Sequence, residues 1–490
     1  MKLKELLRPL VIAKVVGNAD IEIMGIETDS RRVRPGHLFV ALRGFTVDGH
    51  RFVRQAVEQG AVAVLVEEDV DVPVTVVRVP DTRRAMAVLA ATFYRHPTRE
   101  LKLIGVTGTN GKTTTVHLIQ RILNDFGTPA GMIGTIHMQI GDRTYPVQNT
   151  TPDVVELQKG FRMMRDAGCA YAVIEASSHA LDLGRTRGCE FHSAVFTNLT
   201  QDHLDYHKTM EEYRAAKGLL FSQLGNRYED DPADNRYAIL NADDEASAYF
   251  ARITPAQVIT YGIEQNADVR AEQIRQGADG TRFVLRTFRG DVDLHLQLVG
   301  KFNVYNALAA TATALAEGIP LEHIKRSLES VSGVNGRFEK VDEGQPFTVL
   351  VDYAHTPDSL ENVLKTIREF AEGTIYCVVG CGGDRDRTKR PIMAKIAATY
   401  ADVALFTSDN PRTEDPEAIL ADMVEGVKEV PKDRYDVIVD RREAIFEAIR
   451  RARPGDVVLI AGKGHETYQE INGVRHDFDD REVAREALRS

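Results

Sequence analysis

Short apolar runs recur along the chain, and polar or amphipathic stretches separate them. In the middle of the chain the runs lie at residues 101–108, 171–177, 193–199 and 237–243, and the segments between them are long enough for helices. Apolar runs of this length are typical of buried strands. Strands that alternate with helices form a mainly parallel sheet with both faces covered, so the pattern predicts an α/β domain over residues 99–333.

The first 98 residues carry the same alternation in a shorter form. The run "AVAVLV" at residues 61–66 is strand-like, and residues 81–97 have helical character until Pro97 interrupts it. Proline cannot continue a helix and often marks a boundary. We therefore expect a small α/β domain over residues 1–98.

A second series of strand-like runs begins after "GVNGRFE" at residues 333–339. Each run precedes an amphipathic or polar-faced stretch, which predicts a Rossmann-like, doubly wound domain over residues 334–490. In such sheets ligands bind beyond the carboxyl ends of the strands. The segments at residues 380–386, 408–412 and 462–466 should therefore share one rim.

Length and composition agree with three domains and exclude several classes of protein. A chain of 490 residues exceeds what one core usually serves, at about 100 to 200 residues per domain. The charge is 61 minus 72, or −11, which gives no chain-wide basic surface for nucleic acid. No apolar run reaches the roughly 18 residues of a membrane span, and the four cysteines are too sparse for a disulfide framework. We expect a cytoplasmic protein with no nucleic-acid partner and no membrane insertion.

The strongest single motif is "GVTGTNGKTTT" at residues 105–115, between a predicted strand and a predicted helix. Free N–H groups at a helix N-terminus bind phosphate, a lysine reaches the terminal phosphates and a hydroxyl binds Mg²⁺. Lys112 and Thr113 fit these roles. Val106 stands where the longer phosphate loop has glycine, and a Gly-Lys-Thr match alone could be a turn with a surface lysine. The strand-loop-helix context favours an ATP or GTP site.

Two neighbouring predicted strands end in groups that could bind a metal. Glu175 ends one strand, and Asp202 and His203 follow the next. Spacing alone supports a metal site and a plainer alternative equally, in which Glu175 caps a helix and the histidines are solvated. Lys217 lies near the middle of a predicted helix at residues 210–224. By periodicity alone it is a solvated helix lysine.

A longer series of motifs occurs in order along the chain. They are "GTNGKTTT", "EASSHAL", "DHLDYH", "YRAAKGLLF", "NADD", "GKFNVYNALAA", "GVNGRFE", "VDYAHTPDSL", "GCGGDRD", "SDNPRTEDP" and "GKGHE". The series resembles the Mur ligases, and the resemblance covers nearly the whole chain, from residues 29–42 to residues 462–469. It implies that residues 1–98 bind a uridine-nucleotide substrate, residues 99–333 bind ATP and residues 334–490 bind an amino acid.

The resemblance also implies the reaction. The family member would be an ATP-dependent, ADP-forming amide ligase of peptidoglycan precursor synthesis. It would convert the D-glutamate γ-carboxylate of UDP-N-acetylmuramoyl-L-alanyl-D-glutamate to an acyl phosphate, which an amine then attacks. A monomeric enzyme is expected.

Two Mg²⁺ ions and a modified lysine follow from the same resemblance. Thr113 and Glu175 would hold one ion, while His203 and a CO₂-derived carbamate on Lys217 would hold the other. Arg337 would contact the transferring phosphoryl group, beside Lys112. The ATP contacts of the family map onto Gly108, Thr109, Asn110, Gly111, Lys112, Thr113, Thr114, Asn303, Asn306, Asp352 and His355. The alternative for Arg337 is a hinge-region salt bridge.

The uridine substrate would meet residues from two predicted domains. Leu183 and Gly184 stand where a relative has glutamine and histidine, so part of this set departs from the family pattern. Phe45 could equally be a packed aromatic. The residues carried over are Ser30, Phe45, Thr46, Asn149, Thr150, Thr151, Ser177 and Arg185.

In the family, the "DNPR" form of the motif at residues 407–416 accompanies meso-diaminopimelate. That amino acid carries a distal carboxylate that lysine lacks, and a fixed guanidinium and an amide suit it. The expected contacts are Arg385, Asp409, Asn410, Pro411, Arg412, Gly462 and Glu466. An ordinary turn in which Asp415 caps a helix from Pro416 is compatible with this role.

Three rival functions share some of these features, and L-lysine is an alternative as the added amino acid. A folylpolyglutamate synthase shares the loop and amide ligation but lacks the "DNPR" motif and the uridine-binding domain. A P-loop switch gives no reason for "SDNPR" or "GKGHE". A dehydrogenase is excluded, because Arg385 stands where the last glycine of G-x-G-x-x-G would be.

Overall fold

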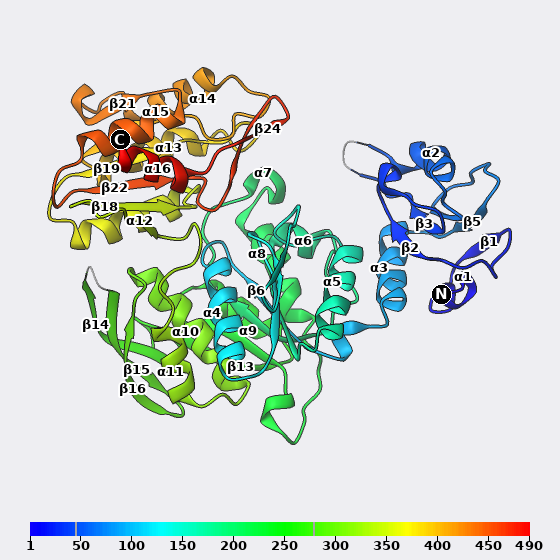
Figure 1. Cartoon of the computed structure of the whole chain (residues 1–490). Helices are drawn as coiled ribbons and strands as arrows, with labels where there is room; N and C mark the ends of the chain where they lie inside the picture. Colours follow the sequence, from blue (N-terminus) through cyan, green and yellow to red (C-terminus); the bar gives the residue numbers. More distant parts are fainter. Residues whose placement is uncertain (45–46, 278–279) are drawn as a thin grey trace.

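The computed structural model describes residues 1–44, 47–277 and 280–490. Its strands form three large sheets that follow one another along the chain (Figure 1). Most neighbouring strands in each sheet are parallel, so the α/β class predicted from the apolar runs is confirmed. No helix in the described part of the chain is long and apolar enough to cross a membrane. Phe45 and Thr46, expected to contact the uridine substrate, lie outside the described residues.

The first sheet has the strand order β1-β5-β4-β3-β2. Strands β2 to β5 are parallel neighbours, and β1 pairs antiparallel with β5 at one edge. Helices α1 and α3 pack on the sheet through apolar residues. The elements are α1 (Leu3–Leu7), β1 (Lys14–Val16), β2 (Gly25–Glu27), β3 (His37–Val40), α2 (Val53–Glu58), β4 (Ala63–Val66), β5 (Thr75–Arg78) and α3 (Thr82–Phe93).

The central sheet has the order β16-β15-β14-β13-β12-β11-β6-β10-β7-β8-β9. The strands are β6 (Lys102–Thr107), β7 (Ala130–Ile133), β8 (Met138–Ile140), β9 (Arg143–Tyr145), β10 (Tyr171–Glu175), β11 (Phe191–Phe196), β12 (Tyr237–Asn241), β13 (Gln257–Gly262), β14 (Val269–Gly277), β15 (Gly280–Thr287) and β16 (Gly290–Leu296). The four apolar runs of the middle segment form β6, β10, β11 and β12. These strands are consecutive in the sheet, in the order β12-β11-β6-β10, and every pair is parallel.

Helices cover both faces of the central sheet. One core lies between the sheet and α4, α10 and α11, and the other lies between the sheet and α5, α8 and α9. Two short helices, α6 and α7, stand at the carboxyl ends of β10 and β11. The helices are α4 (Lys112–Asp125), α5 (Val154–Asp166), α6 (Ser178–Asp182), α7 (Leu204–His207), α8 (Met210–Ser222), α9 (Ala246–Ile253), α10 (Lys301–Ala316) and α11 (Leu321–Glu329).

The C-terminal sheet has the order β17-β18-β22-β19-β20-β21, and all its neighbours are parallel except β17 and β18. Helices α12, α13 and α14 pack on one face, while α15 and α16 pack on the other. The elements are β17 (Glu339–Val341), β18 (Thr348–Asp352), α12 (Pro357–Phe370), β19 (Ile375–Val379), α13 (Lys389–Tyr400), β20 (Val403–Phe406), α14 (Pro416–Val424), β21 (Tyr435–Val437), α15 (Arg441–Arg451), β22 (Val457–Ala461), β23 (Tyr468–Ile471), β24 (Val474–Asp477) and α16 (Asp480–Arg489).

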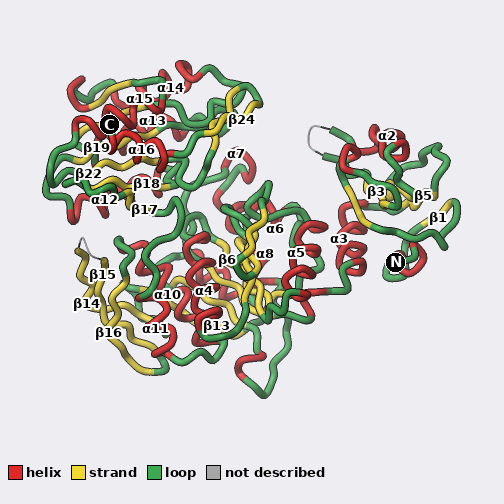
Figure 2. The backbone as a smooth tube through the Cα atoms, viewed as in Figure 1, coloured by secondary structure: helices red, strands yellow, loops and turns green. Residues whose placement is uncertain are grey.

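The C-terminal sheet lies beside the carboxyl ends of the central strands, whereas the first sheet lies apart and is joined through α3 (Figure 2). The loops that follow β19, β20 and β22 all leave the same edge of the parallel sheet, because these strands are neighbours. The segments at residues 380–386, 408–412 and 462–466 therefore share one rim, as the sequence predicts.

Candidate active site

The phosphate loop connects β6 to α4 and has room only for glycine at two positions. Gly108 and Gly111 have φ angles of 150° and 85°. A Cβ at Gly108 would lie 1.8 Å from Thr197 Oγ1, and one at Gly111 would lie 2.4 Å from Asn306 Oδ1. The loop therefore packs tightly against its surroundings, and it enters α4 at Gly111 with no side-chain cap from the described residues, which leaves the helix N-terminus suited to a phosphate.

Lys112 begins α4 and folds back over the loop. Its Nζ donates hydrogen bonds to the carbonyl oxygens of Gly108 (2.9 Å) and Thr109 (2.7 Å). Burial lowers the pKa of Lys112, and the carboxylate of Glu175 opposes that shift. The ammonium group thus sits over the loop, near an acidic side chain of the next strand.

Lys217 is buried in the structure, which rules out the solvated helix lysine that periodicity alone suggested. The residue is 1% exposed. Its Nζ donates to the Gly108 carbonyl oxygen at 2.7 Å and lies 4.4 Å from the centre of the Tyr213 ring. Burial, followed by repulsion from Lys112, lowers the pKa of Lys217 well below its usual value. A low pKa supplies the neutral amine, which is the form that reacts with CO₂.

Glu175 ends β10 in a buried position and does not cap the following helix. Its Oε1 accepts from the Thr135 N–H at 2.8 Å and its Oε2 accepts from the Thr135 hydroxyl at 3.0 Å. The cap of α6 is instead Ser177, whose Oγ accepts from the Ala180 N–H. Of the two interpretations that the spacing left open for Glu175, the helix cap is wrong.

His203 stands at the carboxyl end of β11, where a left-handed φ of 57° precedes α7. Its Nε2 lies 3.3 Å from Asp202 Oδ2. Loss of water around the ring lowers the pKa of His203 to about 3, so the imidazole is neutral at pH 7, which is the form that binds metals.

The predicted metal ligands offer mainly oxygen donors. Within residues 1–44, 47–277 and 280–490, no group of three His, Cys, Asp or Glu side chains is arranged to hold a metal ion. A site here would use the Thr113 hydroxyl, the Glu175 carboxylate, phosphate oxygens and a modified lysine. Mg²⁺ prefers oxygen ligands and bridges substrate phosphates, so this donor set fits Mg²⁺.

Asn303 and Asn306, expected near the nucleotide, lie on α10 beneath the phosphate loop. Asn306 Oδ1 accepts from the Thr115 hydroxyl at 3.3 Å, and Asn306 Nδ2 donates to Asn303 Oδ1 at 3.2 Å. Asn303 Nδ2 in turn donates to the Val299 carbonyl oxygen. Asn306 thus contacts the first turn of α4, and Asn303 holds the Asn306 amide in place.

Residues of the C-terminal domain reach the phosphate loop. Arg337 Nη2 donates to Thr113 Oγ1 at 3.0 Å, and Asn110 Nδ2 donates to Asp358 Oδ2 at 2.7 Å. The Arg337 guanidinium also lies 4.7 Å from the centre of the Tyr353 ring. Arg337 forms no hinge-region salt bridge in the described residues. Asp358 was missed in the sequence, although it follows His355 closely in "AHTPDS".

The other two C-terminal residues expected near ATP flank this contact. Asp352 accepts from the Phe338 N–H at 2.6 Å, and burial raises its pKa to about 6. The His355 ring is 2.8 Å from the Tyr353 carbonyl oxygen, and burial lowers its pKa to about 4. Both side chains are therefore held within their own domain, beside the Arg337 contact.

Four of the residues expected to bind the uridine substrate form one cluster with Glu175. The Thr151 hydroxyl donates to the Glu175 carbonyl oxygen at 2.7 Å, and the same hydroxyl oxygen, Thr151 Oγ1, lies 3.1 Å from Ser177 Oγ. Arg185 donates to the Thr151 carbonyl oxygen, and Thr150 accepts from Thr135. Asn149 is exposed next to this cluster.

Ser30, another described residue of that set, does not join the cluster. It lies in the first domain and donates to Gln55 Oε1 at 2.9 Å. The structure thus places the expected uridine contacts on two separate domains.

The residues expected to bind the amino acid converge on the rim of the C-terminal sheet. Arg412 has a left-handed φ of 53° and donates from Nη1 to the Gly383 carbonyl oxygen at 2.7 Å. A Cβ on Gly382 would lie 2.9 Å from Arg412 Nη1 and 3.8 Å from Arg385 Cγ, so both guanidinium-bearing side chains pass this glycine. Pro411 packs its carbonyl against Gly383.

On the facing side of this rim, Asn410 Nδ2 donates to Glu466 Oε2 at 2.8 Å. Asp409 lies against Gly462, where a Cβ would come within 2.7 Å of Asp409 Oδ2. Burial and then the Asp409 carboxylate raise the pKa of Glu466. The rim thus contains two guanidinium groups, of Arg385 and Arg412, and two carboxylates, of Asp409 and Glu466, and a zwitterionic amino acid needs groups of both charges. The helix cap by Asp415 is also present, since its side chain accepts from the Glu417 N–H.

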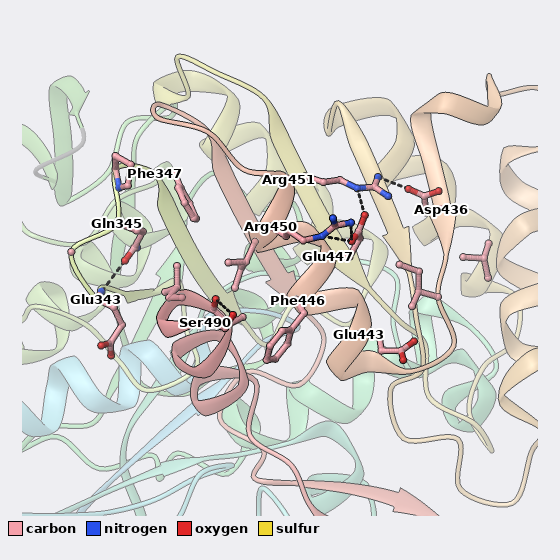
Figure 3. Close-up of a pocket in the computed structure, with 17 residues that line it drawn as sticks. Glu343, Gln345, Phe347, Asp436, Glu443, Phe446, Glu447, Arg450, Arg451 and Ser490 are labelled. Carbon is pink, nitrogen blue, oxygen red and sulfur yellow. Dashed lines mark hydrogen bonds and ion pairs between the residues drawn. The ribbon is translucent and has the colours of Figure 1, made fainter.

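A cavity of about 1030 Å³ lies elsewhere in the C-terminal domain (Figure 3). Phe347 and Phe446 line it, and the Glu447 carboxylate pairs with Arg450 and Arg451 at its edge. It contains none of the predicted site residues. The predicted site residues therefore lie outside this cavity.

Comparisons with known proteins agree on one family. Three family models match successive parts of the chain: "Mur ligase family, catalytic domain" over residues 22–94, "Mur ligase middle domain" over residues 106–314, and "Mur ligase, glutamate ligase domain" over residues 336–464.

Curated relatives match over their full length. A UDP-N-acetylmuramoyl-L-alanyl-D-glutamate--2,6-diaminopimelate ligase of Geobacillus thermodenitrificans is 58% identical, with 100% of this chain and 99% of the relative covered. The enzyme of the same name from Bacillus cereus is 56% identical, with 100% and 98% covered.

Solved structures show the same fold. A structure described by that same ligase name is 36% identical, has a TM-score of 0.69 and covers 100% of this chain and 99% of its own. A folylpolyglutamate synthase of Mycobacterium tuberculosis is 19% identical, with a TM-score of 0.61 and 78% of this chain and 92% of its own covered. That second likeness concerns the fold alone.

Proposed function

The chain belongs to the Mur ligase family, and we propose that it is the ATP-dependent ligase that adds meso-diaminopimelate to UDP-N-acetylmuramoyl-L-alanyl-D-glutamate in peptidoglycan precursor synthesis. The observation that carries this is the full-length identity of 56–58% to ligases named for 2,6-diaminopimelate. The amino-acid rim with Arg412, Asn410 and Glu466 supports the same substrate.

The three domains divide the substrates in this proposal. Residues 1–98 hold the uridine nucleotide, residues 99–333 hold ATP, and residues 334–490 hold the amino acid. Three observations support this division. The phosphate loop lies within residues 99–333, the rim with Arg412 lies within residues 334–490, and Ser30 lies within residues 1–98.

The chemistry needs an activated carboxylate. A carboxylate is a poor acyl donor, so the γ-phosphoryl group of ATP is first transferred to an oxygen of the D-glutamate γ-carboxylate, releasing ADP. The amine then attacks the carbonyl carbon, loses a proton, and the tetrahedral intermediate expels phosphate. Lys112, the loop N–H groups and Arg337 stabilise the charge on the transferring group. The buried Arg337 Nε, which has no hydrogen-bond partner among the described residues, leaves a donor for a phosphoryl oxygen.

Two Mg²⁺ ions complete the proposed site. Thr113 and Glu175 would hold one ion, and His203 with the carbamate of Lys217 would hold the other. When bound, Mg²⁺ screens the repulsion between phosphate and carboxylate oxygens. The carbamate forms when the neutral Lys217 Nζ attacks CO₂ and releases a proton. The lowered pKa of Lys217 favours this reaction.

A cytoplasmic, monomeric enzyme is part of the same proposal. Cys169, Cys189, Cys377 and Cys381 are free and buried. Unpaired cysteines suit a reducing compartment.

The test is phosphate release from Mg-ATP in the presence of UDP-N-acetylmuramoyl-L-alanyl-D-glutamate, with either meso-diaminopimelate or L-lysine added. Release with diaminopimelate alone is the expected result. Release with lysine alone would still support ligase activity, but it would show that L-lysine and not diaminopimelate is the amino acid that is added. Release with folate and glutamate instead would move the chain to the folylpolyglutamate synthase activity, whose fold it shares.

A further inference from the structure

Lys463 is a fully buried lysine in the amino-acid rim, between Gly462 and Gly464. The residue is 0% exposed. Its Nζ donates to Asn410 Oδ1 at 3.1 Å and to Glu466 Oε2 at 3.0 Å. The Nζ also lies 5.4 Å from the centre of the Tyr468 ring. A lysine is rarely buried without a specific partner, and here both hydrogen-bond partners belong to the proposed amino-acid pocket.

The orientation of the Asn410 amide depends on this lysine. An asparagine side chain has one acceptor and one donor end, and an ammonium group can only donate. Lys463 and the Glu470 N–H both donate to Asn410 Oδ1, at 3.1 and 2.9 Å. The amide nitrogen is thereby directed to Glu466, and its second N–H is available to a ligand.

The charge of the pocket also depends on Lys463. Asp409 and Glu466 are two carboxylates in one buried region, and the Asp409 charge raises the pKa of Glu466 while Lys463 lowers it. Lys463 Nζ forms an ion pair with Glu466 Oε2 at 3.0 Å, which offsets part of the repulsion between the two carboxylates. Without Lys463 this repulsion would be unopposed and the pKa of Glu466 would rise further.

We infer that Lys463 is a positioning residue of the amino-acid pocket: its ammonium group orients the Asn410 amide and holds the Glu466 side chain in place through hydrogen bonds, so that the pocket binds the ammonium end of a diamino acid. This inference rests on the proposed function. It assigns Lys463 no contact with the reacting atoms.

The experiment compares wild-type protein with Lys463→Met, which keeps the length of the side chain but removes its charge and its donors. We expect the KM for meso-diaminopimelate to rise about 10- to 100-fold, because the partners of a buried hydrogen-bonded charge are left unpaired. The kcat at saturation and the KM for ATP should stay within about threefold of wild type, since neither depends on this pocket. Raising the pH should lower the KM of the variant, because Glu466 then loses its proton.

A second variant covers the case in which Lys463→Met does not fold. Lys463→Gln keeps N–H donors but not the charge, and it should raise the same KM by a smaller factor. Lys428→Met, an exposed lysine of the same domain, is the control and should match wild type. Folding is checked by the thermal midpoint.

Two results would overturn the inference. One is an unchanged KM for diaminopimelate in both Lys463 variants. The other is a fall in kcat with equal changes in the KM for ATP, which would indicate a general structural role. Failure of the wild-type protein to use diaminopimelate would instead refute the proposed function, and the two failures are therefore distinguishable.

Discussion

The Arg337 guanidinium donates a hydrogen bond of 3.0 Å to the hydroxyl of Thr113, across the junction of the C-terminal and central domains. Thr113 is the expected Mg²⁺ ligand in the first turn of α4, and Arg337 comes from the segment just before β17. The contact means that the phosphate site is built from two domains.

Replacing Arg337 by alanine should therefore slow the chemical step. We expect kcat to fall about 10²- to 10³-fold, as when one donor to a developing negative charge is removed. The KM for the uridine substrate should change little, because that substrate meets other domains. Steady-state phosphate release measures both constants.

Arg442→Ala is the matched control, since Arg442 lies in the same domain and pairs with Glu486 on the surface. Its kinetics should match wild type. An Arg337→Ala variant with normal kcat would show that the contact with Thr113 has no catalytic role.

Lys217→Ala should remove most activity, because the buried amine and the carbamate it would carry are lost from beside the phosphate loop. We expect a loss of at least about 10²-fold. A short-chain carboxylic acid in the assay should restore part of the activity if the carbamate supplies a carboxylate-like anion. Intact-protein mass spectrometry of the wild type in bicarbonate should show a gain of one CO₂.

Lys208→Ala controls for this region, because Lys208 is exposed and the one hydrogen bond of its side chain within the described residues goes to the Asp205 carbonyl oxygen. It should keep full activity. Normal activity of Lys217→Ala without added acid would contradict the carbamate role.

Apolar runs and motif context were sufficient for the α/β class and for the phosphate loop, because strand burial and the loop geometry are local. The same runs missed β15, where exposed Arg282 and Arg286 alternate with buried Phe283 and Leu285. The sequence also missed how deeply Lys217 and Lys463 are buried. Periodicity assigns a side chain to one face of a helix, but only the fold shows that another loop covers that face. The family resemblance placed Arg337 at the transferring phosphoryl group, but its contact with Thr113 is visible only in the fold, because the two residues are far apart in the sequence.

Arg412→Lys should impair the use of diaminopimelate. An ammonium group cannot make the two parallel hydrogen bonds that a guanidinium offers a carboxylate. The kcat/KM for diaminopimelate should fall about 10²-fold or more, while the KM for ATP should stay near wild type. Phosphate release at varied diaminopimelate concentration measures this change.

Arg387→Lys is the control, since Arg387 lies in a neighbouring loop and pairs with Asp422, and it should behave as wild type. Equal kinetics for both variants would refute the role of Arg412.

The last prediction concerns acid stability near the same rim. Arg390 is 0% exposed and donates to Glu414 at 3.0 and 2.8 Å, and Glu414 also accepts from the Asp384 N–H. Glu414 thus links the loop after β20 to the loop after β19. The Arg390 hydrogen bonds lower the pKa of Glu414 from 4.5 to about 2.

A folded-state pKa below the unfolded value means that ionised Glu414 stabilises the folded state. This contribution is fully present above pH 4.5 and is lost as the pH falls through about 2. Glu414→Gln should therefore lower the thermal midpoint at neutral pH, and its difference from wild type should shrink as the pH is lowered below 4.5. Glu429→Gln, at an exposed position, should show no such dependence. Scanning calorimetry across this range tests the prediction, and a constant difference between Glu414→Gln and wild type at all pH values would contradict it.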